Sequence, residues 1–399
     1  MGKTTTMGRT LGAILTLCAA AVAPTAVTAQ TKEPIRLGLV TSQSGAFAEA
    51  GVYIVRAVQF AVDDANAKGG VDGRKVELRV VDDESTPDAG RRGGEKLARD
   101  GYNLLIGPIA SSISLAMVGN LERWDAVLLD VAPKSDKLTG DSCKPRYFRT
   151  NHSDAMDLAM VSEWSKTFKD KKFAIAASDY VWGRDSGESF ERSVKSQGKS
   201  VALALYTPLG TKDYSPYIAQ LKAADVDAIW VAEAGRDAIA FVKQAKEFGL
   251  IPATKLIGQV LITDYTVNAT GSALEGTAGT LGYVPDLDTP KNRAFVAAWK
   301  AKSPTPPADY HGQAYNGVQV MFEGVTRAGS VKPADVAKAL SGATLDTIYG
   351  SVKMRAEDHQ LVLPNFIARV KMVDGTLRPA FEQQFPTSIV PAPSPLCKM

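Results

Sequence analysis

The chain has 399 residues and a formal net charge of +3, with 22% charged and 45% hydrophobic residues. This composition is ordinary for a globular protein, and the length suggests two or three domains. A charge balance so close to neutral disfavours a nucleic-acid-binding function, because proteins that hold polyanions concentrate basic residues on one surface.

The first 29 residues have the features of a secretory signal peptide. Lys3 and Arg9 are their only charges, and an apolar run of about a dozen residues starts at Leu11. The small residues at the end of this segment predict cleavage after Ala29. A membrane anchor is the alternative, but a bilayer span needs ~20 apolar residues. A lipid anchor at Cys18 is disfavoured, because the small residues usual before a lipidated cysteine are missing.

Cleavage would leave 44 basic and 43 acidic residues, a formal charge of +1, and two cysteines, Cys143 and Cys397. An even number of cysteines in an exported protein predicts a disulfide. This one would tie the C-terminal tail to the N-terminal third of the chain. The alternative is two free thiols.

From residue 35 onward, the pattern alternates between short strands and helices. We expect strands at 35–40, 75–81, 104–106 and 127–129, and helices at 48–66, at 87–100 and from 111 toward 121. The first helix carries apolar residues that predict one broad buried face, namely Val52, Val55, Val58, Phe60 and Val62. Such β-α repetition is typical of a parallel doubly wound sheet.

The same rhythm restarts near residue 147. Strands are expected at 147–150, 172–177, 201–206, 228–231 and from 256, with helices at 153–168, 183–197, 214–224 and 235–248. Helices at 292–302, 309–328 and 333–340 follow, then strands near 348–354 and 366–373, and a Pro-rich tail. The chain thus contains two α/β units, near 31–150 and 153–282, and the remaining residues, too few for a third unit, should complete both.

The most informative stretch is 104–117, with the sequence LLIGPIASSISLAM. Its apolar run, Gly-Pro break and serine-rich helical start indicate a strand-to-helix turn. The first N–H groups of a helix have no partner inside the helix, and the helix dipole favours negative charge there. With the hydroxyls of Ser111 and Ser112 beside them, these groups can bind a carboxylate. The alternative is that one of the two serines is simply the helix N-cap.

No motif of a known catalytic site is present. The sequence contains no HExxH, CxxC, GxSxG or GxxxxGK[ST] pattern, and we expect no enzyme activity, metal or cofactor. His152, His311 and His359 are scattered, and we interpret them as surface or hinge residues. The acidic pair at 82–83 closes a strand, which indicates a structural role.

Several segments, in this order and spacing, resemble the periplasmic leucine/branched-chain amino-acid binding proteins of ABC transporters. The resemblance covers nearly the whole mature chain. The segments that carry it are IRLGLV at 35–40 with Ser44-Gly45, ANAKGGVDGRK at 65–75, Asp82-Asp83, IGP at 106–108 with Ser111-Ser112, YFRT at 147–150, AIAFVKQAKEFGL at 238–250 and ADYHGQAYNG at 308–317.

The resemblance implies an α/β protein of the type I periplasmic-binding-protein fold, with two doubly wound parallel-sheet lobes joined by three crossovers. Lobe one would comprise 31–150 and 284–350, lobe two 151–283 and 351–390, and 391–399 would form a tail. A small carboxylate ligand would be captured in the interlobe cleft by hinge closure and delivered to a membrane permease. We expect a periplasmic monomer; the alternative is a ligand-sensing subunit of a signalling receptor.

In lobe one, the resemblance assigns the ligand carboxylate to Ser111 or Ser112 and to the next loop, DVAPKSD at 130–136. Ala132 is the small residue of that loop, and Lys134 stands where the family has a hydroxyl. An ammonium in the cleft would strengthen anion binding. The alternative is that Lys134 points to solvent.

In lobe two, the resemblance assigns an aromatic contact to Trp182. Phe47 and Tyr53 in lobe one and Tyr180 in lobe two are further candidates for an aromatic pocket. The alternative for all four is a place in the core or hinge. The acid that usually holds the ligand's α-ammonium is missing from IGQVLI at 257–262, and Glu233 and Asp264 are the nearest substitutes. If Glu233 fills that role, the ligand is a branched-chain or related amino acid, as the family favours. If Lys134 faces the cleft and no acid meets an ammonium, the ligand is a carboxylate without an amino group, such as an aromatic or hydroxy acid.

Overall fold

The structure is a computed structural model that describes residues 1–8 and 32–399. The chain divides into Met1–Lys32 and Glu33–Met399, and all that follows concerns the second unit. The predicted cleavage after Ala29, the apolar run of the signal peptide and Cys18 lie outside the described residues.

Five parallel strands form the first sheet, in the order β2-β1-β3-β4-β5. Its strands are β1 (Ile35–Thr41), β2 (Val76–Asp82), β3 (Leu104–Ile106), β4 (Val127–Asp130) and β5 (Tyr147–Arg149). Helices α1 (Ala48–Ala67), α2 (Pro87–Arg99) and α3 (Ser111–Val118) connect the first four strands, and a 3-10 helix, η1 (Asp136–Thr139), follows β4. Strands β3 and β4 are completely buried and, apart from Asp130 at the end of β4, apolar, as expected for parallel strands covered on both faces.

Seven strands form the second sheet, in the order β15-β14-β10-β9-β8-β6-β7. Five run parallel: β6 (Lys172–Ser178), β7 (Ser200–Thr207), β8 (Ala228–Ala232), β9 (Lys255–Gln259) and β10 (Ala278–Leu281). The helices of this part are α4 (Asp154–Ser165), α5 (Val181–Lys195), α6 (Ser215–Ala223), α7 (Gly235–Glu247), α8 (Asp264–Thr270) and the 3-10 helix η2 (Gly271–Leu274). Two antiparallel strands, β14 (Asn365–Val373) and β15 (Thr376–Phe385), extend the sheet at one edge.

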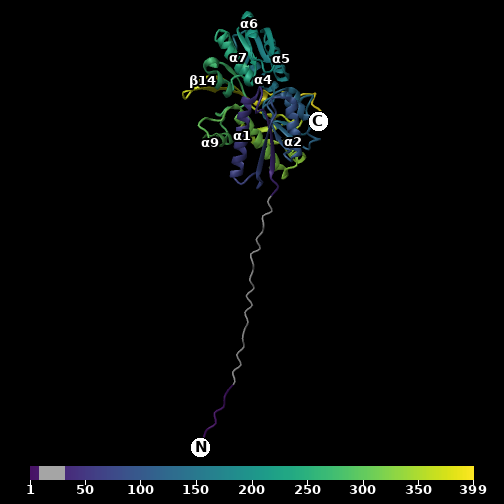
Figure 1. The fold of residues 1–399 in the computed structure, drawn as a ribbon, viewed down its shortest axis with the longest axis vertical. Coiled ribbons are helices and arrows are strands. Elements are labelled where there is room, and N and C mark those ends of the chain that lie inside the picture. Colours follow the sequence, from purple (N-terminus) through teal and green to yellow (C-terminus); the bar gives the residue numbers. More distant parts are fainter. Residues whose placement is uncertain (9–31) are drawn as a thin grey trace. The chain divides into compact units, whose positions relative to one another are not determined.

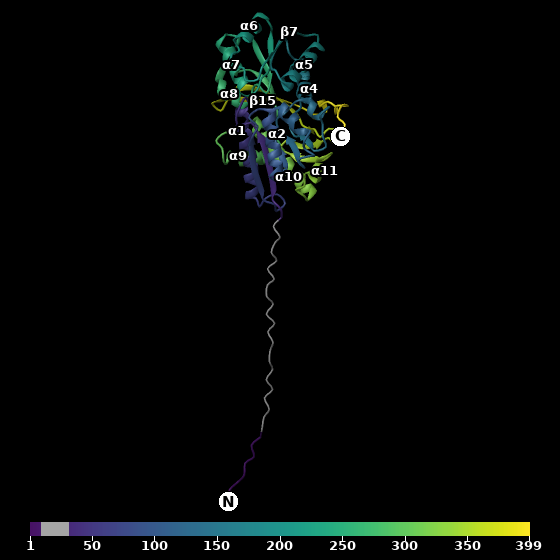
Figure 2. The same ribbon diagram turned by 45° about the vertical axis from the view of Figure 1, so that its right-hand side comes forward.

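The chain segment between β10 and β14 forms helices α9 (Pro290–Lys300), α10 (Asp309–Ala328) and α11 (Pro333–Leu340). It also forms a small antiparallel sheet of β11 (Thr344–Thr347), β12 (Gly350–Met354) and β13 (Leu361–Val362). Helix α10 packs along α1, and α11 contacts β4, so both belong with the first sheet. Figures 1 and 2 show α1 and α2 beside one sheet and α5, α6 and α7 beside the other.

The chain passes between the two sheets three times: after β5, after β10 and before β14. This topology confirms the predicted α/β class of two doubly wound lobes joined by three crossovers. The lobe boundaries at 150/151, 283/284 and 350/351 stay a prediction. The expectation of a Pro-rich tail directly after residue 373 is wrong, because residues 376–385 form β15, which pairs with β14 along its length.

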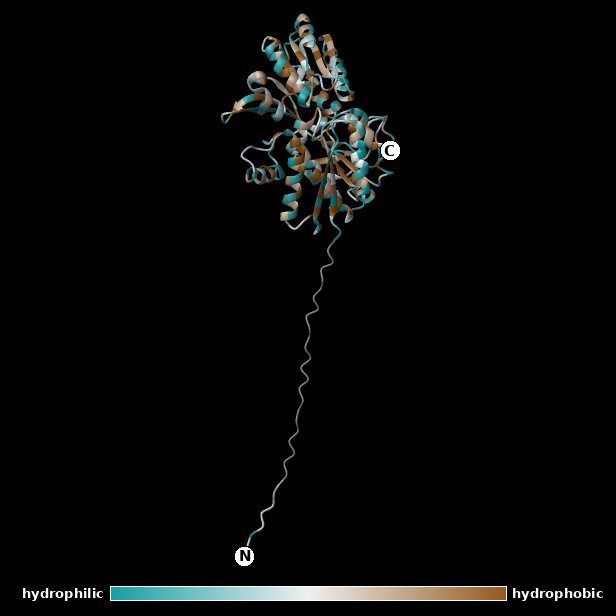
Figure 3. Ribbon diagram, viewed as in Figure 1, coloured by the Kyte–Doolittle hydropathy of each residue, from teal (hydrophilic) through white to brown (hydrophobic). Residues whose placement is uncertain are grey.

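Hydrophobic residues concentrate in the strands and on the helix faces that cover them, as the colouring of Figure 3 shows. On α1, Val58 and Val62 are buried as predicted, but Val52 is 62% exposed, so its predicted burial is wrong. The reason is the helical period: six residues turn the helix by about 240° beyond a full turn, which places Val52 about 120° away from Val58 around the axis.

Two further predictions concern cysteine and histidine. Cys143 and Cys397 are joined in a disulfide, which confirms the pairing predicted from their number and from export. The three histidines are all buried, so a surface position is wrong for each of them. Among the described residues, no helix combines the length and the apolar character required to cross a bilayer.

Candidate functional site

The loop after β3 brings the start of α3 to the carboxyl end of the first sheet. Gly107 in this loop has a φ of +103°, and a Cβ at this position would lie 1.9 Å from the backbone oxygen of Val40. Only glycine allows so close an approach to β1 together with this backbone conformation. The loop, which includes the cis peptide Gly107–Pro108, thereby holds Ser111 at the edge where parallel sheets generally bind ligands.

Neither serine at the start of α3 caps the helix. The N-cap residue is Ala110, which has no side-chain cap hydrogen bond, so the N-cap alternative for Ser111 and Ser112 is wrong. Instead, the Oγ of Ser111 accepts the backbone N–H groups of Lys134 at 3.2 Å and of Ser135 at 3.1 Å. A hydroxyl oxygen has two lone pairs and one hydrogen, so both acceptor positions are occupied while the hydrogen is available to donate.

Ser111 forms part of the wall of a cavity of about 20 Å³. Apart from Tyr310 at the start of α10, every wall residue follows the carboxyl end of a strand, in either sheet. The wall consists of Phe47, Ile109, Ser111, Ala132, Lys134, Tyr180, Trp182, Ala234, Val260 and Tyr310. The structure therefore brings together six of the eight predicted site residues. A larger open groove of about 680 Å³ lies beside α1 and α8, but it contains none of these six.

The aromatic residues form one side of this cavity. The ring of Tyr180 lies 6.1 Å from that of Phe47 and 5.9 Å from that of Trp182, measured between centroids. Tyr53, the fourth aromatic candidate, is not in the wall and stacks on His311 instead. A cavity of about 20 Å³ holds about one water molecule, so a larger ligand must enter while the walls are farther apart.

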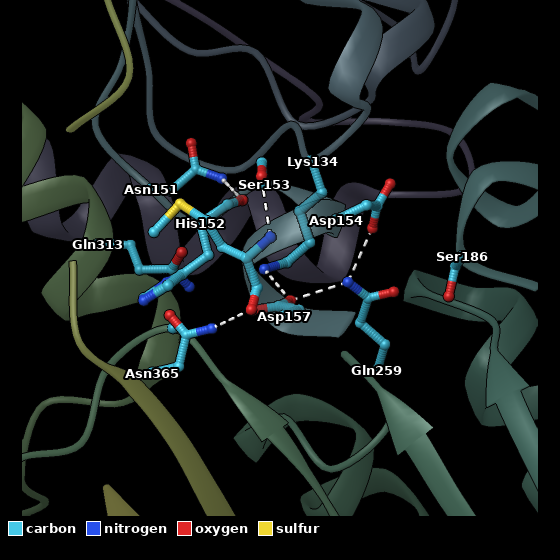
Figure 4. Close-up of polar contacts among 12 residues, drawn as sticks. Lys134, Asn151, His152, Ser153, Asp154, Asp157, Ser186, Gln259, Gln313 and Asn365 are labelled. Carbon is cyan, nitrogen blue, oxygen red and sulfur yellow. Dashed lines mark hydrogen bonds and ion pairs between the residues drawn. The ribbon is translucent and has the colours of Figure 1, made fainter. Parts of the chain in front are cut away.

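Lys134 is buried, so the alternative that it points to solvent is wrong. Its Nζ lies 2.7 Å from Oδ2 of Asp157 on α4, and both side chains are almost inaccessible. The Nε2 of Gln259, at the end of β9, donates to the same oxygen and to Oδ1 of Asp154, each at 2.8 Å (Figure 4). This ion pair connects a loop of the first sheet to a helix of the second. The ammonium of Lys134, which the sequence analysis expected to bind the ligand carboxylate, therefore already has a counter-charge within the protein.

Asp154, the other carboxyl group in this network, is also buried. Burial raises its pKa well above the usual range, and the nearby Asp136 and Asp185 raise it further, while Lys134 and Gln259 lower it. These shifts favour the neutral form of Asp154.

Glu233 and Ser112 are the two predicted site residues outside the cavity wall. Glu233 is fully buried, and its two oxygens accept the hydroxyl groups of Ser178 and Thr207, each at 2.5 Å. Burial raises the pKa of Glu233 to about 7, and these two hydrogen bonds oppose that shift. The structure thus places Glu233 in a closed cluster at the strand ends of the second sheet.

Two hydrogen bonds between the lobes are made by residues next to the wall residues Phe47 and Lys134. The backbone N–H of Arg236 on α7 donates to the backbone oxygen of Ala46 at 2.9 Å, and the hydroxyl of Ser135 donates to Asp185 on α5 at 2.6 Å. With the Lys134–Asp157 ion pair, these contacts describe an arrangement in which the lobes are closed.

Four wall residues were not predicted: Ile109, Ala234, Val260 and Tyr310. The first three lie within three residues of the carboxyl ends of β3, β8 and β9. The rule that ligands bind at the carboxyl ends of parallel strands would therefore have found them. Tyr310 lies on a helix that returns from the second lobe, and only its place in the segment ADYHGQAYNG gave a signal. Asp157, the partner of Lys134, had no signal in the sequence, because nothing local relates α4 to the loop after β4.

Chemically, the cavity offers a hydroxyl donor and the start of a helix at one end and aromatic rings around the remainder. This arrangement suits a small molecule with a carboxylate and an apolar body. In the described part of the chain, no group of three or more His, Cys, Asp or Glu residues is placed to hold a metal ion.

Comparison with known proteins gives a consistent result. The family model described as periplasmic binding protein matches residues 34–376. The leucine-, isoleucine-, valine-, threonine- and alanine-binding protein of Pseudomonas aeruginosa is 26% identical over 336 residues, covering 84% of this chain and 89% of its own length. The Leu/Ile/Val-binding protein homolog 2 of Brucella abortus is 28% identical over 333 residues, covering 83% of this chain and 88% of its own.

Solved structures with the same fold include two solute-binding proteins of ABC transporters. One, from R. palustris in complex with 4-hydroxybenzoate, has a TM-score of 0.81 and 22% identity, covering 88% of this chain and 97% of its own. The other, from Rhodopseudomonas palustris BisB5 in complex with 3,4-dihydroxybenzoic acid, has a TM-score of 0.80 and 25% identity, covering 88% and 96%. The two-lobed topology and a family match over most of its length together establish that this chain belongs to the periplasmic binding protein family.

Proposed function

We propose that this protein is the solute-binding component of an ABC importer and that it captures a small carboxylic acid in the cavity between its lobes. The carboxylate is held by the hydroxyl of Ser111 and the first backbone N–H groups of α3, and the apolar body lies among Phe47, Tyr180, Trp182 and Tyr310. The observation that carries the proposal is the hydrogen-bond pattern of Ser111, whose oxygen accepts two N–H groups and whose hydrogen is free to donate at the cavity wall.

Ligand capture proceeds by hinge closure at the three crossovers, with lobe one at 31–150 and 284–350 and lobe two at 151–283 and 351–390. The contacts of Ser135 with Asp185 and of Ala46 with Arg236 form on closure. The closed form is then recognised by the membrane permease. The protein works as a monomer without catalysis, and the N-terminal signal peptide directs it to the periplasm. The names of its relatives support this role, since they are amino-acid-binding proteins and solute-binding proteins of ABC transporters.

The test is a thermal-shift screen of the mature protein against amino acids, aromatic acids, hydroxy acids and dicarboxylic acids. A ligand that binds only the folded state raises the melting temperature by mass action, so a hit identifies the class. The affinity of each hit is then measured by titration calorimetry for the wild type and for Ser111→Ala.

The substitution Ser111→Ala removes one hydrogen bond to a charged group, which contributes about 1.5–3 kcal/mol, so the ligand should bind about 10- to 150-fold more weakly. The matched control is Ser112→Ala, which removes the neighbouring hydroxyl outside the cavity wall and should leave the affinity unchanged. An affinity of Ser111→Ala within twofold of the wild type, or a screen without any carboxylate hit, would refute the proposed site.

A further inference from the structure

The charge pattern of the cavity wall says more about the ligand than its shape does. Lys134 is the only charged residue among the described wall residues, and no carboxylate is among them. The remaining wall is made of apolar and aromatic side chains and the hydroxyl of Ser111. A ligand cation in this cavity would therefore meet another cation and no anion.

Three buried acids outside the cavity wall, Asp154, Asp157 and Glu233, each accept at least one hydrogen bond from the protein. Asp157 receives the ammonium of Lys134 and the amide of Gln259 on a single oxygen. Asp154 receives the same amide on Oδ1, and although its Oδ2 has no hydrogen-bond partner, Asp154 is not part of the cavity wall. Glu233 receives two hydroxyl groups at the end of the second sheet. The ammonium of Lys134 thus occupies the position beside Asp157 that the ammonium of a ligand would need in order to pair with this carboxylate.

An α-amino acid cannot keep its ammonium away from this loop. The ammonium is attached to the carbon next to the carboxylate, and the carboxylate is bound by Ser111, whose Oγ lies 3.2 Å from the backbone nitrogen of Lys134. The ammonium would lose its hydration, would be repelled by Lys134 and would meet no carboxylate in the cavity wall. Two like charges in a buried site strongly disfavour binding.

We propose that Lys134 is a specificity-determining residue, which makes the site select carboxylic acids without an ammonium group, such as aromatic and aliphatic monocarboxylic acids, and reject the corresponding α-amino acids. This inference rests on the proposed function and specifies its ligand class. Lys134 acts as an internal cation that is permanently paired with Asp157, so the protein supplies the charge that an amino-acid ligand would otherwise bring.

The test uses pairs of ligands that differ only in the ammonium group: 3-phenylpropanoate with phenylalanine, and 4-methylpentanoate with leucine. Titration calorimetry should show that the wild type binds the acid without ammonium at least about 100-fold more tightly than its partner. In Lys134→Met, Asp157 is released and can accept a ligand ammonium, so this preference should fall at least about tenfold.

Two controls separate this effect from a general loss of structure. Lys137→Met removes an exposed lysine from η1, three residues farther along the chain, and should leave the preference unchanged. The double variant Lys134→Met with Asp157→Asn removes the ion pair as a unit and releases no carboxylate, so it should keep a preference for the acid without ammonium. It also avoids the unpaired buried Asp157 that could prevent Lys134→Met from folding.

The outcomes are distinct. If the wild type binds phenylalanine or leucine as tightly as its partner, the inference is overturned while the proposed function stands. The same holds if Lys134→Met keeps the full wild-type preference, or if the double variant loses it as completely as the single one. If no member of either pair binds and the wider screen finds no carboxylate ligand, the proposed function fails, and the inference fails with it.

Discussion

A methyl group added at Gly235 should weaken ligand binding by blocking closure of the lobes. Gly235 is the first residue of α7 and has a φ of +59°. A Cβ at this position would lie 2.2 Å from the backbone oxygen of Ala46, in the loop after β1 of the first sheet. The next residue, Arg236, donates its backbone N–H to that same oxygen at 2.9 Å. Gly235→Ala therefore opposes a contact between the lobes without changing any residue of the cavity wall.

The expected loss of binding free energy in Gly235→Ala follows from the contacts between the lobes that the added methyl group breaks. Real Cβ atoms essentially never approach another atom within 3.0 Å, so the two backbone segments must separate by about 0.8 Å. That movement would stretch the Arg236–Ala46 hydrogen bond beyond useful length, a loss of about 0.5–1.5 kcal/mol. The exposed ion pair between Arg236 and Glu49 adds at most about 1 kcal/mol. The sum, about 0.5–2.5 kcal/mol, corresponds to binding that is about 2- to 70-fold weaker.

The assay is titration calorimetry of wild type, Gly235→Ala and a matched control, Gly249→Ala, with the best ligand of the screen. Gly249 follows the same helix and also has a positive φ, +67°, but the nearest atom to its Cβ position is the Nζ of Lys222 at 4.0 Å. Both variants should lose about 1–2 kcal/mol of folding stability from backbone strain. Only Gly235→Ala should lose affinity, and equal affinities in the two variants would refute the reasoning.

Two further predictions concern stability. Replacing Cys143 by Ser opens a disulfide that spans 254 residues, which should lower the free energy of unfolding by ~3–5 kcal/mol in urea titrations, with Cys397 then reactive in a thiol assay. Replacing Glu233 by Gln should change how stability depends on pH. Burial raises the pKa of Glu233 to about 7 in the folded protein from an ordinary value of 4.5, so the folded state binds the proton more tightly and stability falls as pH rises from 4.5 to 7. This contributes about 3 kcal/mol across that window, which Glu233→Gln should remove in urea titrations at pH 5 and pH 8.

The controls for these two variants use the wild type under changed conditions. Reducing agent should lower the unfolding midpoint of the wild type and leave that of Cys143→Ser unchanged; two reactive thiols in the oxidised wild type would contradict the disulfide. For Glu233→Gln, the difference in unfolding free energy from the wild type should grow with pH. A difference that stays constant between pH 5 and pH 8 would show that Glu233 is ionised in both states.

The alternation of strands and helices was readable from the sequence because both depend on local periodicity and on turn residues. Helix α10, for example, has the predicted bounds, Asp309 to Ala328. The error at Val52 has a local cause as well, because a list of apolar residues does not determine which of them share a face. Strand β15 was missed because an edge strand with a solvent-exposed face carries many polar residues.

The sequence by itself determined the fold class and the serine turn at the edge of the first sheet, because strand ends and helix starts are encoded by residues close together in the chain. It also determined the disulfide partners, because only two cysteines follow the predicted signal peptide. The partners across the cleft were decided only by the tertiary structure. Lys134 is paired with Asp157 instead of facing solvent, and Glu233 is enclosed by Ser178 and Thr207. A buried charge must find its partner wherever the chain places one, and the folding of two lobes against each other makes that choice.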